Sequence, residues 1–380
     1  MKSKIMKKTL LCLCAAAAGM LQLHAASPQK KIIIPDTKEY QTLICDFHCH
    51  TVFSDAIVWP SARVLEAADE GLDCIAITDH IGPRKNPDYV KGDQNASYDL
   101  AVSTAEAEDI LLIRGGEITR GMPPGHWNAI FLQDVNPLYV NDPEKQLVEA
   151  QKQGGYTFWN HPGWSVQAPN ETVWMPLHEE YYQKGYMMGI EIINGISEYY
   201  PEAFRWALEK NLTIFANTDC HQPMYRLFDY YNGGHRTVTL VFARERSLEG
   251  VREALDNHRT AAYFYDNFYG REDVLRQLFE SCLTLDRVVR ADDHVILYLK
   301  NNTSAPIKLR KAAGSENLSY TREFTIRPGE TWDMWASSLN GKVGEEGFDV
   351  NFEVANFFIT PEDNLKVTFH ILSEDNYTVE

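Results

Sequence analysis

The sequence predicts an α/β barrel followed by a small β-sandwich, and three observations support this prediction. Up to about residue 285, apolar runs of strand length alternate with helical patterns. Repeated strand and helix units of this kind form parallel sheets, and this many of them favour closure into a barrel. Beyond Arg287, short alternating strands and turns replace the helices, which is typical of a β-sandwich.

Eight apolar runs define the strands of the predicted barrel, and helical patterns lie between several of them. Pro60, Pro143 and Pro201 each stand at a predicted helix start. The predicted strands cover residues 42–47, 73–77, 110–114, 129–132, 156–159, 188–193, 213–216 and 237–242. The predicted helices cover residues 61–70, 97–108, 143–153, 201–210 and 247–257. Functional residues of such a barrel gather at the carboxyl ends of its strands.

The pattern of the remaining residues predicts an Ig-like β-sandwich over residues 285–380, which follows a barrel domain over residues 27–284. Turn sequences occur at Asn301-Asn302 and at Pro328-Gly329. Strand patterns cover residues 294–299, 307–310, 323–326 and 365–371. Ligand-type residues do not cluster here, so we expect the sandwich to be an accessory domain that braces the barrel or helps to close its pocket.

The first residues have the pattern of an export signal. Four Lys precede an apolar run over residues 10–21, and small residues follow at Ala25 and Ala26. We therefore expect residues 1–26 to be removed and the mature protein to be periplasmic or secreted. The apolar run is too short to span a membrane, and no later stretch is longer. Cys12 and Cys14 lack the preceding small residues of a lipid-attachment site, so a lipoprotein is the weaker alternative.

The charge of the chain argues against nucleic-acid duplex binding. The formal net charge is −17, and loss of the four Lys in residues 1–26 makes it −21. Binding to a polyanion needs a basic stripe, and the sequence contains none. Five cysteines remain after cleavage, and they are predicted to be buried thiols rather than a disulfide framework: Cys45, Cys49, Cys74, Cys220 and Cys282.

Histidines mark the carboxyl ends of the predicted strands. His48 and His50 close the first strand, and because strand side chains alternate, both point to the same side. Packing alone would explain one such pair. The same placement recurs, however, at or just after the ends of later strands: Asp55, His80, Glu117, His126, His161, Asp219 and His221. Six imidazoles and three carboxylates are therefore expected to meet at one rim of the barrel.

So many ionisable groups in one place need compensation for their charges, which bound metal ions provide. Imidazole and carboxylate ligands without thiolate suit zinc, manganese, iron or nickel, whereas calcium prefers oxygen ligands. Cys49 and Cys220 project to the opposite face and are not predicted to bind the metal. The other histidines of the mature chain are predicted to be surface or packing residues: His178, His235, His258, His294 and His370.

The strings around these residues carry a family resemblance. They are His48-Cys49-His50-Thr51 with Ser54-Asp55, Ile77-Thr78-Asp79-His80, Glu117, His126, Asn160-His161-Pro162 and Asp219-Cys220-His221. Together they resemble the four motifs of the polymerase and histidinol phosphatase (PHP) superfamily and, among its branches, the exported PHP-type phosphodiesterases. The resemblance covers roughly residues 42–265, and every expected ligand position is filled.

The resemblance implies a distorted seven-stranded (β/α) barrel with two or three divalent metal ions, namely zinc, manganese or iron. Glu117 would bridge the first two ions. The implied ligand groups are His48, His50, Glu117 and Asp219 for the first ion, Glu117, His126 and His161 for the second, and Asp55, His80 and His221 for the third. Some members carry His at the position of Asp55, so the third site is expected to differ in affinity or in metal preference.

For function, the resemblance implies a metal-dependent phosphoesterase that cleaves small-molecule phosphoesters, and phosphodiesters above all. We expect a metal-bridging hydroxide to attack phosphorus in line with the leaving oxygen. No Ser or Cys stands beside a basic His other than the predicted ligands, so no catalytic residue is predicted apart from them. Arg84 and Arg120 follow ligand motifs and are predicted to bind the phosphate. Four aromatic residues either line the pocket or pack loops together: Trp164, Trp174, Tyr199 and Tyr200.

Three alternatives remain open at this point. A phosphomonoesterase of the same superfamily would use the same ligands. A metal-dependent amidohydrolase also has a His-x-His pair on its first strand, but no Lys suited to carbamylation is evident at the end of a middle strand. A non-catalytic protein would keep the barrel as a scaffold while the sandwich binds a glycan or a partner, and loss of ligand residues would then be expected.

Overall fold

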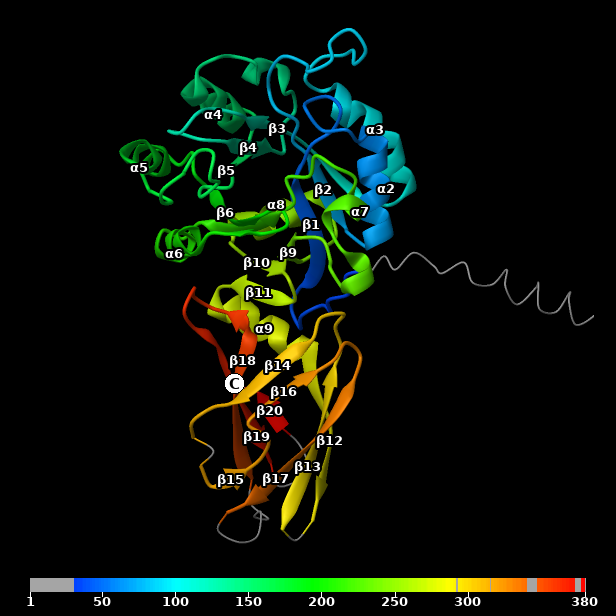
Figure 1. Ribbon diagram of the computed structural model, residues 1–380, viewed down its shortest axis with the longest axis vertical. Coiled ribbons are helices and arrows are strands. Elements are labelled where there is room, and N and C mark those ends of the chain that lie inside the picture. Colours follow the sequence, from blue (N-terminus) through cyan, green and yellow to red (C-terminus); the bar gives the residue numbers. More distant parts are fainter. Residues whose placement is uncertain (1–30, 292, 315, 340–346, 373–376, 380) are drawn as a thin grey trace, which may run out of the picture.

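The computed structural model describes residues 31–379 except 292, 315, 340–346 and 373–376. The predicted export signal at residues 1–26 lies outside the described residues. A barrel-like α/β part and a β-sandwich follow one another along the long axis of the molecule (Figure 1). Within the described ranges, the helices are all too short or too polar to cross a membrane.

The α/β part is built on a curved sheet that contains every predicted strand. The order across the sheet is β9, β1, β2, β3, β4, β5, β6 and β8. A short strand, β7 (Glu198–Tyr199), forms a hairpin with β6. The strands are β1 (Gln41–Cys49), β2 (Cys74–Ile77), β3 (Leu111–Ile118), β4 (Trp127–Ile130), β5 (Tyr156–Trp159), β6 (Gly189–Asn194), β8 (Thr213–Asn217) and β9 (Val238–Ala243).

The alternation of strands and helices predicts a purely parallel sheet, but the sheet is mixed. β1, β2 and β3 run parallel to one another, as do β5, β6 and β8. β4 is antiparallel to both of its neighbours, and β9 is antiparallel to β1. Residues 119–126 alone connect β3 to β4, which is too short for the crossover that a parallel pair needs.

The two ends of this sheet meet where β8 lies beside β1 and β9. The Phe47 amide donates to Asn217 Oδ1 over 2.9 Å. Ala216 donates to and accepts from Thr239 Oγ1, both at 2.9 Å. These side-chain bonds close the seam together with a backbone bridge between Cys49 and Cys220. Because Asn217 stands two residues before Asp219, this closure also fixes the strand that carries the last ligand motif.

Helices cover the outside of the sheet, and all five predicted helices are present. Three begin at the predicted prolines, and the Asp142 carboxylate caps one of them by accepting from the Glu144 and Lys145 amides at 3.1 and 3.2 Å. The five predicted helices are α2 (Pro60–Glu70), α3 (Ala96–Ala107), α4 (Pro143–Lys152), α6 (Pro201–Glu209) and α8 (Leu248–Asp256). Further helices and turns are α5 (Pro176–Gln183), α7 (Met224–Leu227), α9 (Glu272–Cys282), η1 (Asn136–Leu138) and η2 (Tyr230–Asn232).

The C-terminal part is a sandwich of two antiparallel sheets. Inward and outward side chains alternate along its strands, as the four predicted strand patterns require. One sheet contains β12 (Leu283–Arg290), β13 (His294–Asn301), β15 (Leu318–Ser319) and β17 (Thr331–Ser338). The other contains β14 (Ile307–Lys311), β16 (Glu323–Ile326), β18 (Phe348–Phe358), β19 (Asn364–Ile371) and β20 (Tyr377–Val379).

The two parts share one sheet and one core. From β9, the barrel sheet continues through β10 (Thr260–Phe264) and β11 (Asn267–Gly270), and β11 pairs in parallel with β18 of the sandwich. The ring centroid of Phe268 lies 4.5 Å from that of Phe357. A single buried cluster extends from Ile32 at the start of the barrel to Ile371 in the sandwich. The sandwich is therefore packed onto the barrel and is not tethered by a linker alone.

Candidate metal centre

The loop that carries the first motif is held against the end of β2. A register shift in β1 between Asp46 and Cys49 precedes this loop, as bulges often do beside functional sites. The Asp79 carboxylate accepts from the Thr51 amide at 2.7 Å, from Thr51 Oγ1 at 2.7 Å and from Ser54 Oγ at 2.6 Å. Asp79 therefore orders the loop, and its neighbour His80 is left to face the site.

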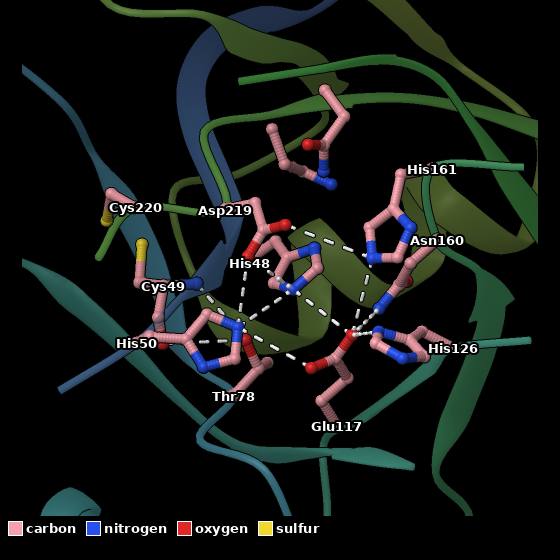
Figure 2. A network of polar contacts seen from close by, with 12 residues as sticks. His48, Cys49, His50, Thr78, Glu117, His126, Asn160, His161, Asp219 and Cys220 are labelled. Atoms are coloured by element: carbon pink, nitrogen blue, oxygen red, sulfur yellow. Dashed lines mark hydrogen bonds and ion pairs between the residues drawn. The ribbon is translucent and has the colours of Figure 1, made fainter. Parts of the chain in front are cut away.

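Glu117, near the end of β3, lies at the centre of the predicted ligands. Its carboxylate is 1% exposed and touches imidazoles from four segments of the chain. The distances are 2.5 Å to His80 Nδ1, 2.9 Å to His126 Nδ1, 3.5 Å to His161 Nε2, 3.6 Å to His50 Nε2 and 3.7 Å to His48 Nε2. Figure 2 shows Glu117 and Asp219 pointing toward the imidazoles of His48, His50, His126 and His161.

The two other carboxylates each join a pair of imidazoles. Asp219 Oδ1 lies 3.2 Å from His48 Nε2 and 3.1 Å from His50 Nε2. Asp55 Oδ1 lies 2.9 Å from His221 Nε2 and 3.3 Å from His80 Nε2. The structure thus brings all nine predicted residues together. The ligand atoms of eight of them form three overlapping groups, and Asp219 joins these through its contacts with His48 and His50. The groups are His48, His50 and Glu117; Glu117, His126 and His161; and His50, Asp55, His80 and His221. His50 stands in the third group as well as the first, which the resemblance does not imply.

The hydrogen bonds behind His48 and His50 show that the donor set suits a cation. His48 Nδ1 lies 2.8 Å from Glu191 Oε1, which can only accept, so this nitrogen carries a hydrogen. His50 Nδ1 lies 3.2 Å from Ser54 Oγ, whose own hydrogen goes to Asp79, so it also donates. Both Nε2 atoms then present lone pairs to each other at 3.1 Å. Such a contact is repulsive unless a proton or a metal ion lies between the two nitrogens.

The charges of the buried groups support the same conclusion. Burial raises the pKa of the Glu117 carboxyl, but the surrounding imidazoles, His80 foremost, hold it well below its usual value. Burial lowers the pKa of His48, yet the nearby carboxylates, Asp219 first, raise it to about 10. For His50 burial prevails, and the pKa falls to about 4. The Glu117 carboxylate is therefore ionised, and either protons on the imidazoles or bound divalent ions balance its charge.

A cavity of about 200 Å³ opens onto these groups. His48 and His50 lie beneath it and are fully buried, whereas His80 and His221 keep 27% and 33% of their side chains exposed. Beyond predicted ligands, the wall contains Trp164, Asn194 and Glu198. The third ion that the resemblance implies would thus lie nearest to solvent, and a substrate would reach the other ligand groups through this opening.

Sequence reasoning missed Glu191, which lies in the middle of β6 and is fully buried. Besides His48 Nδ1, its carboxylate accepts from the His161 amide at 2.8 Å, Asn194 Nδ2 at 2.9 Å and Asn217 Nδ2 at 2.9 Å. This arrangement fixes the ring of His48 with Nε2 toward the site. A charged residue inside an apolar strand was the signal that could have identified it, because an isolated charge is rarely buried.

Replacing Glu191 with Gln is therefore expected to lower metal affinity by about 10- to 100-fold, as replacing a residue that orients a ligand usually does. Titration with a competing chelator would measure this change. Glu70→Gln is a matched control, because Glu70 is also buried and bonds to Tyr230 Oη at 2.7 Å, outside the ligand groups. Unchanged metal affinity in Glu191→Gln would contradict the role, even if the melting temperature falls.

The structure does not direct the two predicted phosphate-binding arginines into the cavity. Arg84 donates to the carbonyl oxygens of Phe53 and Asp93. Arg120 donates to the carbonyl oxygens of Thr119 and Val140 and to Gln146 Oε1. Both guanidinium groups are thus occupied in holding loops, and neither lines the cavity. A role in substrate binding remains a prediction that would require these loops to move.

Of the four aromatic residues that follow ligand motifs, one lines the cavity and three do not. Trp164 lines the cavity, whereas Trp174 packs beside Trp159 and Trp206, Tyr199 lies against Tyr269, and Tyr200 is buried.

All five described cysteines are free and buried, as predicted. The sulfurs of Cys49 and Cys220 lie together with Asp46 and Arg236, away from the nine predicted ligands. His178 is a buried packing residue, stacked on Trp159 at 3.9 Å.

Comparisons with known proteins agree with this layout. A family model described as an Ig-like domain matches residues 287–370. No curated protein matches the chain. A crystal structure from Bacteroides vulgatus, described as a two-domain protein containing a predicted PHP-like metal-dependent phosphoesterase, is 48% identical with a TM-score of 0.86, covering 91% of this chain and 100% of that one.

A second structure, described as a putative metal-dependent phosphoesterase from Bifidobacterium adolescentis, is 15% identical and covers 56% of this chain and 95% of that one. Its TM-score of 0.39 is too low to support an inference. The similarity to the Bacteroides vulgatus protein, in contrast, extends through both the α/β part and the sandwich. By this similarity, the chain belongs to the family of two-domain proteins with a PHP-like metal-dependent phosphoesterase domain.

Proposed function

We propose that this protein is a metal-dependent hydrolase of phosphoesters, and of phosphodiesters above all, which uses two or three divalent ions held by the nine predicted ligands. The observation that carries this proposal is the set of three ligand groups joined through Glu117 and His50. Ions that share ligands in this way lower the pKa of a bound water and neutralise charge on the oxygens of the phosphoryl group. Zinc, manganese and iron suit the donor set.

The cavity wall supports water as the nucleophile. Among the described residues, no Ser, Thr, Cys or Lys lines the cavity. Two hydroxyl groups beside the ligands are engaged, because Ser54 Oγ donates to Asp79 at 2.6 Å and Thr119 Oγ1 bonds to His80 Nδ1 at 2.6 Å. A covalent phosphoenzyme therefore has no evident attachment point. The missing Lys also argues against an amidohydrolase that needs a carbamylated lysine as a ligand.

The charge of the wall favours diesters over monoesters. No Lys or Arg belongs to the part of the wall that the structure describes, and Glu198 adds a negative charge. A phosphomonoester is largely a dianion at neutral pH, so its second charge would have to be balanced by the bound ions alone. A diester carries a single negative charge. The site therefore suits the less charged substrate better.

A three-substrate panel tests this function. We expect the purified protein to contain divalent metal and to hydrolyse bis(p-nitrophenyl) phosphate at least about tenfold faster than p-nitrophenyl phosphate, a difference of about 1.4 kcal/mol. A chelator should abolish both activities, and added zinc, manganese or iron should restore them. Cleavage of p-nitrophenyl acetate alone would instead support an amidohydrolase-like enzyme, and preference for the monoester would support a phosphomonoesterase.

A further inference from the structure

Glu198 differs from every other carboxylate that lines the cavity. Asp55, Glu117 and Asp219 each form ion pairs with site imidazoles. Glu198 forms none with the described residues, and its Oε2 accepts a hydrogen bond from Tyr200 Oη. Its second oxygen, Oε1, has no partner in the described part of the chain. Glu198 therefore stands apart from the ligand groups and still faces the space that a substrate enters.

Two wall residues besides Glu198 are not predicted ligands, and both already contact other side chains. Asn194 directs its Nδ2 to Glu191 at 2.9 Å. The ring of Trp164 packs against His126 and His161, with centroid distances of 5.6 and 5.3 Å. Glu198 is thus the wall residue that is left to offer a charged acceptor to a ligand.

The position of Glu198 is fixed by the packing of Tyr200. The Tyr200 side chain is 5% exposed, and its hydroxyl reaches the Glu198 carboxylate. A Cβ atom added to Gly163 would lie 2.5 Å from Tyr200 Cδ1, so the loop that bears His161 can approach this ring only because residue 163 is glycine. The carboxylate is thereby held relative to the ligand loop.

The turn before Glu198 is anchored as well. Gly195 accepts at its carbonyl from Thr237 Oγ1 at 2.6 Å, and Ile196 accepts from Tyr265 Oη at 2.7 Å. Asn194 and Glu198 face each other across the hairpin of β6 and β7. The acceptor is therefore presented by rigid elements, as recognition of a specific group requires.

We propose that Glu198 is a substrate contact that selects phosphodiesters whose alcohol part carries hydroxyl or ammonium donors, such as esters of glycerol, sugars or amino alcohols. This inference rests on the proposed phosphodiesterase function. A phosphoryl group at the ligand groups would leave its alcohol part in the same cavity, whose wall contains Glu198. A hydrogen bond from a donor to an ionised carboxylate is stronger than one between neutral groups, whereas a second phosphate charge is repelled.

The test compares two diesters that differ in donors. Glycerophosphoglycerol carries hydroxyl donors, and bis(p-nitrophenyl) phosphate carries none. Glu198→Gln keeps the shape of the side chain but removes its charge. We expect the ratio of kcat/KM for glycerophosphoglycerol to kcat/KM for the aryl diester to fall about 5- to 10-fold, because a neutral acceptor replaces a charged one. Glu209→Gln, which removes the same charge from the exposed end of α6, should leave the ratio unchanged.

Tyr200→Phe keeps the packing of the ring but removes the hydroxyl that holds the Glu198 carboxylate. Loss of one hydroxyl is expected to raise KM for glycerophosphoglycerol more than KM for the aryl diester, with metal content intact. If Glu198→Gln lowers kcat/KM equally on both diesters, or on neither, the ratio is unchanged. That result would overturn the inference while leaving the phosphodiesterase function in place. A wild-type protein that is loaded with metal and cleaves neither diester would refute the proposed function itself.

Discussion

Replacing Glu117 with Gln is expected to lower kcat on a phosphodiester by more than about 100-fold. Replacing residues that only hydrogen-bond to the metal ligands already lowers metal affinity or activity by about 10- to 100-fold. The two Glu117 oxygens lie within 3.7 Å of ring nitrogens from five histidines. Gln preserves the shape of the side chain but removes its charge and one acceptor. Two of the three ligand groups contain Glu117, so both should lose metal affinity together.

Metal analysis of the purified variant measures this effect directly, and kinetics on bis(p-nitrophenyl) phosphate measure its consequence. Glu70→Gln again serves as the control, since it removes an equally buried carboxylate (1% exposed) that lies outside the ligand groups. That control should be less stable but should retain its metal and its activity. A Glu117→Gln protein with a full metal complement and nearly normal kcat would show that Glu117 does not bridge the ions.

The parts of this centre that depend on local chain geometry were predictable from the sequence. Strand alternation places His48 and His50 on one side, and the structure brings their Nε2 atoms to within 3.1 Å of each other. The same rule places Cys49 on the opposite face, where its sulfur accepts from Arg236 at 3.5 Å. Convergence of the remaining ligands followed from the rule that functional residues gather at the carboxyl ends of strands.

The parts that depend on contacts between distant segments were not predictable in this way. Strand direction is one example, because β4 and β9 are antiparallel although their apolar patterns resemble those of the parallel strands. Side-chain direction is another. Arg84 and Arg120 follow ligand motifs in the sequence, but carbonyl oxygens of neighbouring loops bind their guanidinium groups. Glu191 was missed because its partners come from three other segments.

The pairing of β11 with β18 is the long-range contact that joins the sheet of the barrel to the sandwich. Phe357 is fully buried, and its ring centroid lies 4.5 Å from that of Phe268 and 5.8 Å from that of Phe279. No sandwich residue belongs to the described wall of the cavity. These two facts favour a sandwich that braces the barrel over one that closes the pocket.

Phe357→Ala in the full chain is accordingly expected to lower the free energy of unfolding by about 3–5 kcal/mol, as removal of a buried Phe side chain does. The protein that remains folded should keep its kcat and its metal content. Chemical denaturation followed by fluorescence would measure the first effect, and steady-state kinetics below the transition would measure the second. Trp335→Ala is the control, because Trp335 is 53% exposed on β17.

Removal of the whole sandwich should have a larger effect. Expressed alone, residues 27–284 would expose Phe268 and Phe279, whose burial contributes up to about 3–6 kcal/mol together. Natural domains of this size are stable by only about 5–15 kcal/mol, and the fragment would also lose the partner of β11. We therefore expect it to be insoluble or to unfold without a cooperative transition. A soluble fragment that binds metal and melts at the temperature of the full chain would show that the barrel does not depend on the sandwich, and kinetics on that fragment would then show whether the sandwich acts on the pocket instead.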